Sequence, residues 1–185
     1  MLSRRSILFG IGAVAVTPAA ALAQAAMPSE AQIQMRLEAA PKLRVAPDKR
    51  VTVEQFKRRS ELRRAAPSID IQAINFEFNS ARIPSSQYRK VEAIARALNR
   101  LRRRRPGAII LLEGHTDAVG SASYNLQLSE ERARSLRRLL VRRYGIPPRM
   151  LETVGYGEHY LLINTPYEDW RNRRVTLRRI DDFIR

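Results

Sequence analysis

The sequence contains no cysteine among its 185 residues. This absence excludes disulfide bonds, thiol nucleophiles, thiolate metal sites and a lipid-modified amino-terminal cysteine. It leaves the redox compartment open, because proteins of reducing and of oxidising compartments can both lack cysteine.

Histidine is scarce as well, and the common catalytic motifs are missing. The chain has two histidines and no HExxH pair, GxSxG elbow, phosphate-binding loop or dinucleotide fingerprint. Glu113, His115 and Asp117 make a poor metal or acid–base cluster, because the first two share at best one strand face and Asp117 is a sparse third ligand. The sequence therefore favours a protein that is not an enzyme and has no cofactor or metal.

Lysine is rare, although the chain is strongly basic. Four of the 34 basic residues are lysines, which leaves 30 arginines, and the formal net charge is +16. A field of this size attracts polyanions such as nucleic acid, anionic lipid and acidic cell-wall polymers. The bias toward arginine favours partners that offer planar carboxylates or phosphates.

The first 23 residues have the pattern of an export signal. Arg4 and Arg5 precede an apolar run at residues 7–16, and the small-residue site Ala-Leu-Ala ends at residue 23. The SRRSIL stretch is compatible with twin-arginine export, and Sec export is equally compatible. An uncleaved anchor is the alternative, but Pro18 leaves the apolar run short for a span of about 20 residues. Export predicts a periplasmic protein and argues against nucleic acid as a partner.

Residues 24–66 are interpreted as an amino-terminal helical or linker segment. Proline, alanine and charged residues alternate there without a persistent strand pattern. Ile33 and Leu37 indicate one short helix, and Phe56 and Leu62 indicate another. We expect this segment to be loosely attached, either to span distance or to dock a partner.

Residues 67–185 predict one domain of α+β class. Strands are expected at residues 68–78, 108–112, 150–157 and 173–180, and helices at residues 85–105 and 121–144. The first helix has apolar residues at helical spacing and Ser85 as a candidate cap. The order β-α-β-α-β-β predicts two main helices packed on a mixed four-stranded sheet.

Two polar residues fall within the apolar stripe of the second predicted helix. Asn125 and Arg132 are seven residues apart and share a face with Leu136. A guanidinium on a core-facing stripe needs an anionic partner, and Asp117, at the exit of the preceding strand, is the natural candidate. Two alternatives follow: an internal ion pair that pins the loop to the helix, or a shared cleft suited to a zwitterion.

Five ordered motifs carry a resemblance to a known family. They are NFEFNSARI at residues 75–83, GHTDAVGSASYNLQLSEERA at 114–133, YGI at 144–146, VGYGE at 154–158 and NRRV at 172–175. Together they resemble the OmpA-like C-terminal domain, the peptidoglycan-associating module shared with peptidoglycan-associated lipoproteins and flagellar stator proteins. The resemblance covers residues 69–180 and implies a βαβαβ-type sandwich of helices on a mixed sheet, in agreement with the element order.

The resemblance also implies a ligand and its site. Members of this family bind the diaminopimelate of the peptidoglycan stem, whose free end is zwitterionic. By their motif positions, Asp117 takes the ammonium and Arg132 the carboxylate. The other residues implied at the site are Thr116, Asn125, Glu77 and Asn79. Glu77 stands where the family commonly has aspartate, and Arg173 and Arg174 of NRRV are expected to serve the fold.

The expected function is that of a non-catalytic envelope protein that binds peptidoglycan and tethers the outer envelope to the wall. Outer-membrane or other envelope proteins are further candidate partners. One alternative is a polyanion or membrane-surface binder that works through its exposed arginines. Another is an adaptor whose residues 24–66 dock another envelope complex.

Overall fold

The computed structural model describes residues 27–72, 74–76 and 80–185. The predicted export signal at residues 1–23 and the predicted site residues Glu77 and Asn79 lie outside this part. The helices are α1 (Glu30–Glu38), α2 (Val53–Arg58), α3 (Ser60–Ala65), α4 (Tyr88–Arg104) and α5 (Ala122–Tyr144). The strands are β1 (Ser68–Ile71), β2 (Ile110–Gly114), β3 (Leu151–Gly155) and β4 (Val175–Arg179). Short 3₁₀ turns span Pro47–Lys49, Ser85–Gln87 and Pro148–Met150.

The four strands form one mixed sheet in the order β1-β4-β2-β3. β2 and β3 are parallel and are joined through α5, whereas β4 is antiparallel to both of its neighbours. The register places Gly114 opposite Val175, so the residues that follow β2 lie beside those that precede β4. The predicted fold, with two main helices on a mixed four-stranded sheet, is confirmed.

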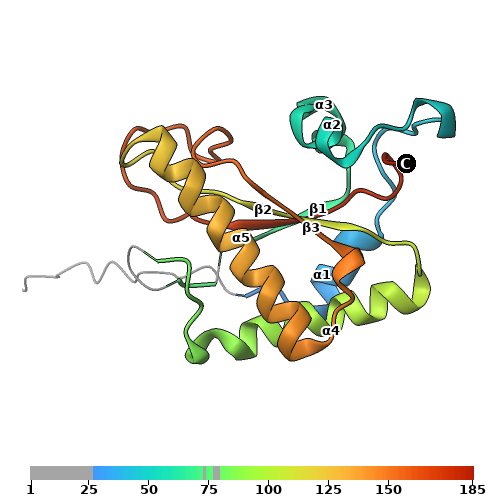
Figure 1. Cartoon of the computed structure of the whole chain (residues 1–185), viewed down its shortest axis with the longest axis horizontal. Coiled ribbons are helices and arrows are strands. Elements are labelled where there is room, and N and C mark those ends of the chain that lie inside the picture. Colours follow the sequence, from blue (N-terminus) through green and yellow to red (C-terminus); the bar gives the residue numbers. More distant parts are fainter. Residues whose placement is uncertain (1–26, 73, 77–79) are drawn as a thin grey trace, which may run out of the picture.

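Helices cover both faces of the sheet (Figure 1). Ile110 and Leu112 of β2 belong to a core with residues of α1, α4 and α5. Leu111, which points the opposite way, belongs to a second core with residues of α2, α3 and the carboxyl-terminal segment. Because strand side chains alternate between faces, this double cover explains why β2 reads as an uninterrupted apolar run.

The predicted apolar stripe of α4 is confirmed, but its predicted cap is wrong. Val91, Ile94, Leu98 and Leu101 are fully buried. Ser85 does not cap the helix, because it begins a 3₁₀ turn whose last residue is the one before α4.

Helix α5 begins and ends where the sequence predicts. The Ser121 hydroxyl accepts a hydrogen bond from the Tyr124 backbone, and Gly145 ends the helix in the left-handed conformation at φ 66°. The helix lies directly on the sheet at two glycines. A Cβ atom on Gly114 would lie 2.0 Å from the Ser129 carbonyl oxygen, and one on Gly155 would lie 2.4 Å from the backbone nitrogen of the next helical residue.

The first strand is shorter than predicted. β1 ends at Ile71, which pairs with Val175 at the start of β4. Val175 is the first residue of β4, so β1 has no strand partner beyond Ile71. The described residues that follow β1 therefore lie outside the sheet. Ile74 is nevertheless buried in the core, as its apolar character predicts.

The interpretation of the amino-terminal segment as loosely attached is wrong for residues 27–66. Ile33 and Leu37 are fully buried in the same core as α4. Phe56 is also fully buried, and its ring lies 5.7 Å from that of Phe183. Val51 forms a parallel bridge with Ile184 at the carboxyl terminus. Short helices such as these are stabilised mainly by tertiary contacts with the rest of the domain. Such contacts cannot be predicted from the periodicity of the helix sequence alone.

A buried ion cluster holds α3 against the sheet. Glu113 of β2 is fully buried and accepts two hydrogen bonds from Arg63, at 3.1 and 2.8 Å, and two from Arg178, at 2.7 and 3.1 Å. Burial alone would raise the pKa of Glu113, but the nearby His115 ring and the hydrogen bonds from the two guanidinium groups lower it well below its usual range. The carboxylate therefore stays ionised inside the protein.

Two aromatic rings enclose the Arg63 guanidinium. Its central carbon lies 3.9 Å from the ring centroids of both Tyr156 and Tyr160. Cations over such rings are stabilised by the ring quadrupole, and more so where water is excluded. Arg63 consequently links α3 both to β2 and to the segment that follows β3.

His115 follows β2 and is nearly as buried as Glu113. Its Nε2 atom lies 3.7 Å from a Glu113 carboxylate oxygen and 3.3 Å from the Thr176 hydroxyl. Burial lowers the pKa of His115, Glu113 opposes this shift, and the positive charges of Arg174 and Arg63 add to it. The imidazole is therefore neutral in the folded protein at neutral pH.

The first prediction concerns the ion cluster. Glu113→Gln should lower the free energy of unfolding by about 3–5 kcal/mol, because it leaves two buried guanidinium groups without their anion. Urea denaturation followed by circular dichroism measures the change. Glu131→Gln, an exposed carboxylate on α5, is the matched control and should change stability by less than about 0.5 kcal/mol. Equal unfolding midpoints for both variants would refute the structural role of the cluster.

The second prediction concerns pH. The His115 pKa is lower in the folded state than the 6.5 of the free side chain, so the unfolded state alone gains a proton as the pH falls below that value. Stability should therefore decline from about pH 7 toward pH 5, by up to about 1.4 kcal/mol per pH unit. His115→Gln should flatten this decline in urea titrations at several pH values. Parallel stability curves for variant and wild type would contradict the assignment.

Candidate functional site

The candidate site lies where β2 ends and the chain turns toward α5. The His115 backbone N–H donates to the Arg174 carbonyl at 3.0 Å, and that of Thr116 donates to the Gly157 carbonyl at 3.0 Å. These two bonds clamp the loop between the segment before β4 and the one after β3. Asp117 follows directly and is placed by these bonds at the edge of the sheet.

Asp117 pairs with an arginine other than the predicted one. Its Oδ2 atom accepts a hydrogen bond from Arg173 Nη1 at 2.8 Å, and its Oδ1 atom accepts a longer one, 3.4 Å, from the Val119 backbone. Arg173 also pairs with the exposed Glu168. Asp117 is buried, with 7% of the residue exposed. One of its carboxylate oxygens is thus engaged by a strong ionic hydrogen bond and the other by a weak one.

Arg132 projects from α5 without a direct ion pair to Asp117. Its Nε atom donates to the Ser80 carbonyl at 3.3 Å, and its guanidinium lies 5.0 Å from the centroid of the Phe76 ring. Burial lowers the pKa of Arg132, and the charge of Arg173 lowers it further, whereas Asp117 raises it. The three charged groups are thus close enough to act on one another electrostatically, although the internal Asp117–Arg132 ion pair is not formed.

Asn125 fastens the loop to the helix. It is 2% exposed, and its side-chain amide donates to the carbonyls of Val119 at 3.2 Å and Asp117 at 3.4 Å and to the Glu158 carboxylate at 2.8 Å. Gly120, at φ 104°, supplies the backbone conformation that this tight loop requires. Asn125 therefore shapes the loop that carries Asp117.

Thr116 lies beside Asp117 and is 3% exposed. Its hydroxyl oxygen has no hydrogen-bond partner among the residues that the structure describes. Of the six residues that the sequence assigns to the site, four are thus gathered on or next to the loop, and Glu77 and Asn79 belong to the undescribed part.

Arg173 is the site residue that sequence reasoning missed. Both NRRV arginines were expected to serve the fold, and Arg174 does so through its ion pair with Asp70 at 3.2 Å and its hydrogen bond to the Tyr160 carbonyl at 2.9 Å. Arg173 instead reaches Asp117. The strand register would have predicted this contact. Gly114 of β2 pairs with Val175 of the antiparallel strand β4, so the residues after Gly114 lie beside the residues before Val175.

The arrangement is suited to binding a charged molecule. A carboxylate is paired with one guanidinium group and acts electrostatically on a second, and the loop that carries the carboxylate is clamped by backbone hydrogen bonds. Within residues 27–72, 74–76 and 80–185, no group of three or more metal-binding side chains is found. In the same residues, no helix has the length and apolar character needed to span a bilayer.

Comparisons with known proteins agree with this architecture. The chain is 33% identical over 104 residues to outer membrane porin F of Pseudomonas aeruginosa, and 35% identical over 106 residues to the peptidoglycan-associated lipoprotein of the same organism. These matches cover 55% and 56% of this chain, and 29% and 60% of the two relatives. The chain thus spans less than two thirds of the length of either relative.

Solved structures share the fold. The periplasmic domain of Helicobacter pylori MotB superposes with a TM-score of 0.52 at 21% identity, over 60% of this chain and 72% of that one. The cell wall anchor of the type VI secretion system of P. aeruginosa superposes with a TM-score of 0.50 at 24% identity, over 60% and 79%. The sequence model of the OmpA family matches residues 75–174, which include β2, α5, β3 and the whole described loop around Asp117. Because this match extends over more than half of the sequence, the chain belongs to the OmpA family.

Proposed function

We propose that this protein is a non-catalytic, exported envelope protein that binds peptidoglycan at the Asp117–Arg132 site and tethers the outer envelope to the wall. The ligand is the zwitterionic end of diaminopimelate in the peptide stem. The observation that carries the proposal is the geometry of Arg132, a largely buried guanidinium that acts electrostatically on Asp117 without pairing with it.

The relatives support association with the wall. Two of them, from Pseudomonas aeruginosa and Pseudomonas putida, are named peptidoglycan-associated lipoproteins and are each 35% identical to this chain over 106 residues. The family match at residues 75–174 includes the loop and the helix that carry the site. The predicted export signal would deliver the protein to the periplasm, where the wall is accessible.

Asp117 can accept the ammonium end of such a ligand. Arg173 engages one carboxylate oxygen, and the other receives only the long bond from Val119. An ionised carboxylate has about four acceptor positions, so Oδ1 retains the capacity for an ionic hydrogen bond. Arg173 also fixes the orientation of the Asp117 carboxylate before a ligand arrives.

Arg132 can accept the carboxylate end. Its Nε atom is engaged by the Ser80 carbonyl, whereas its terminal nitrogens form no hydrogen bond with the described residues. A planar guanidinium can donate two parallel hydrogen bonds to a carboxylate. Thr116, next to Asp117, is assigned to the same site by its motif position, and its buried hydroxyl has no partner among the described residues.

The third prediction tests this site. Arg132→Ala and Asp117→Asn should each reduce co-sedimentation of the protein with diaminopimelate-type peptidoglycan, with affinity falling at least about tenfold because a charge-assisted hydrogen bond is lost. Arg134→Ala, which removes an exposed arginine of α5 that pairs with Glu130, is the control and should sediment like wild type. Circular dichroism establishes that all variants are folded.

A general attraction between basic protein and acidic wall would give a different result. In that case, binding would fall steeply with added salt and would be insensitive to Asp117→Asn, because exposed charges are screened first. Wild-type sedimentation of both site variants would therefore overturn the assignment and favour the polyanion-binding alternative.

A further inference from the structure

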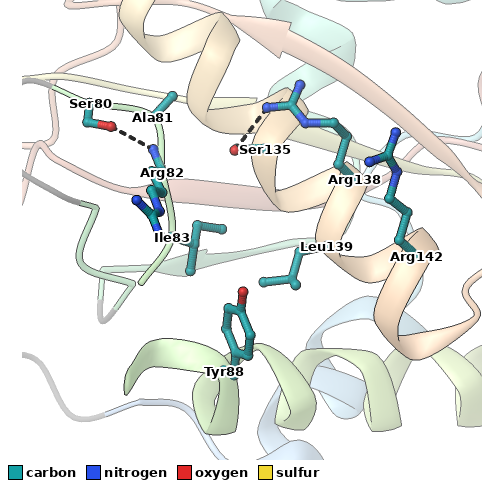
Figure 2. A pocket seen from close by; sticks show the side chains of 9 residues that line it. All are labelled: Ser80, Ala81, Arg82, Ile83, Tyr88, Ser135, Arg138, Leu139 and Arg142. Atoms are coloured by element: carbon teal, nitrogen blue, oxygen red, sulfur yellow. Dashed lines mark hydrogen bonds between the residues drawn. The ribbon is translucent and has the colours of Figure 1, made fainter. Parts of the chain in front are cut away.

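A groove lies next to the candidate site, between the segment at residues 80–83, the start of α4 and the middle of α5. It has a volume of about 480 Å³. Figure 2 shows its lining residues, which are Ser80, Ala81, Arg82, Ile83, Tyr88, Ser135, Arg138, Leu139 and Arg142. A space of this size accommodates a small peptide fragment.

The rim of the groove is cationic. Three arginines line it and no acidic residue does. Arg138 donates to the Ser135 hydroxyl at 3.0 Å, and neither Arg138 nor Arg142 forms an ion pair with a carboxylate of the described residues. Figure 2 shows both side chains projecting from the same side of α5. Two guanidinium groups without internal anions make this groove selective for a negatively charged group.

The floor of the groove is apolar. Ile83 is buried, and Tyr88 and Leu139 pack against the main core. Figure 2 shows these three side chains, one from the segment at residues 80–83, one from α4 and one from α5, gathered in the space between the three elements. Aliphatic groups of a ligand can therefore lie on this floor while its charged groups meet the arginines, which distinguishes the groove from an exposed basic surface.

The groove is continuous with the Asp117–Arg132 site. Ser80 lines the groove, and its carbonyl accepts the hydrogen bond from Arg132. Arg132, Ser135, Leu139 and Arg142 follow one another at spacings of three or four residues, which places them along one side of α5. A ligand bound at Arg132 can thus extend along the helix into the groove.

We propose that the groove binds a second carboxylate of the same peptide, one residue away from the zwitterionic residue. This inference rests on the proposed function. In a stem of this type, glutamate is joined to diaminopimelate through its side-chain carboxyl, so its α-carboxylate is free. Arg138 and Arg142 lie about 9 and 15 Å along the helix from Arg132, from the rise per residue. The glutamyl α-carboxylate and the carboxylate of the zwitterionic end are separated by eleven bonds, an extended span of roughly 14 Å.

The fourth prediction compares three ligands by isothermal titration calorimetry on the purified exported protein. They are meso-diaminopimelate, the tripeptide L-alanyl-γ-D-glutamyl-meso-diaminopimelate, and the same tripeptide with the glutamyl α-carboxylate converted to a carboxamide. Wild type should bind the acidic tripeptide about tenfold more tightly than the carboxamide, because the ionic hydrogen bonds in the groove require the carboxylate.

A double variant tests the two arginines. Arg138→Gln with Arg142→Gln should abolish the preference for the acidic tripeptide and leave the affinity for meso-diaminopimelate within about twofold of wild type. The matched control is Arg102→Gln with Arg103→Gln, which removes the same charge from exposed positions of α4 and should retain the preference.

The outcomes separate this inference from the proposed function. If wild type binds none of the three ligands, the proposed function is wrong and the groove assignment is wrong with it. If wild type binds meso-diaminopimelate but the acid and the carboxamide bind equally well, only the groove assignment is overturned. The same conclusion follows if the double variant retains the preference.

Discussion

The fold depends on an ionised carboxylate enclosed within the protein. Glu113 joins three segments that are distant in the sequence, because its two oxygens hold Arg63 of α3 and Arg178 of β4 while its backbone belongs to β2. A buried anion of this kind is stable only while both cations remain in place. Glu113 therefore couples the amino-terminal helices to the centre of the sheet. The loop after β2 begins just beyond this cluster, so the cluster also helps to fix the position of that loop.

The seating of α5 adds a second constraint. Gly114 and Gly155 allow the helix backbone to touch two strands where any side chain would separate them. This close contact fixes the height and rotation of α5 on the sheet, and hence the direction in which Arg132 projects. Asn125 fastens the same helix to the loop that carries Asp117. The two charged residues are thus positioned by the backbone packing of the domain, which is a rigid support for recognition.

Local sequence patterns predict most of the helices and strands correctly. They do not predict the ion pairs between segments that are distant in the sequence. The stripe from Val91 to Leu101 and the caps of α5 are properties of neighbouring residues, so periodicity and turn chemistry suffice. The pairing of Arg63 with Glu113 joins residues 50 positions apart, and nothing in the short helix around Arg63 distinguishes it from the many other arginines. The sequence alone shows that Arg132 has no anionic partner on its own helix. Identifying Arg173 as the partner of Asp117 requires the strand register, which the sequence does not supply.

The docking of the amino-terminal helices also has a mechanical consequence. In a tether, tension enters through one part of the chain and leaves through the bound polymer. The attachment of α3 at Glu113 and the candidate site at Asp117 are four residues apart, at the end of β2 and in the loop that continues it. A pull on α3 would therefore reach the loop that carries Asp117 through the buried ion cluster and the backbone of β2, which is itself held by β3 and β4 on either side.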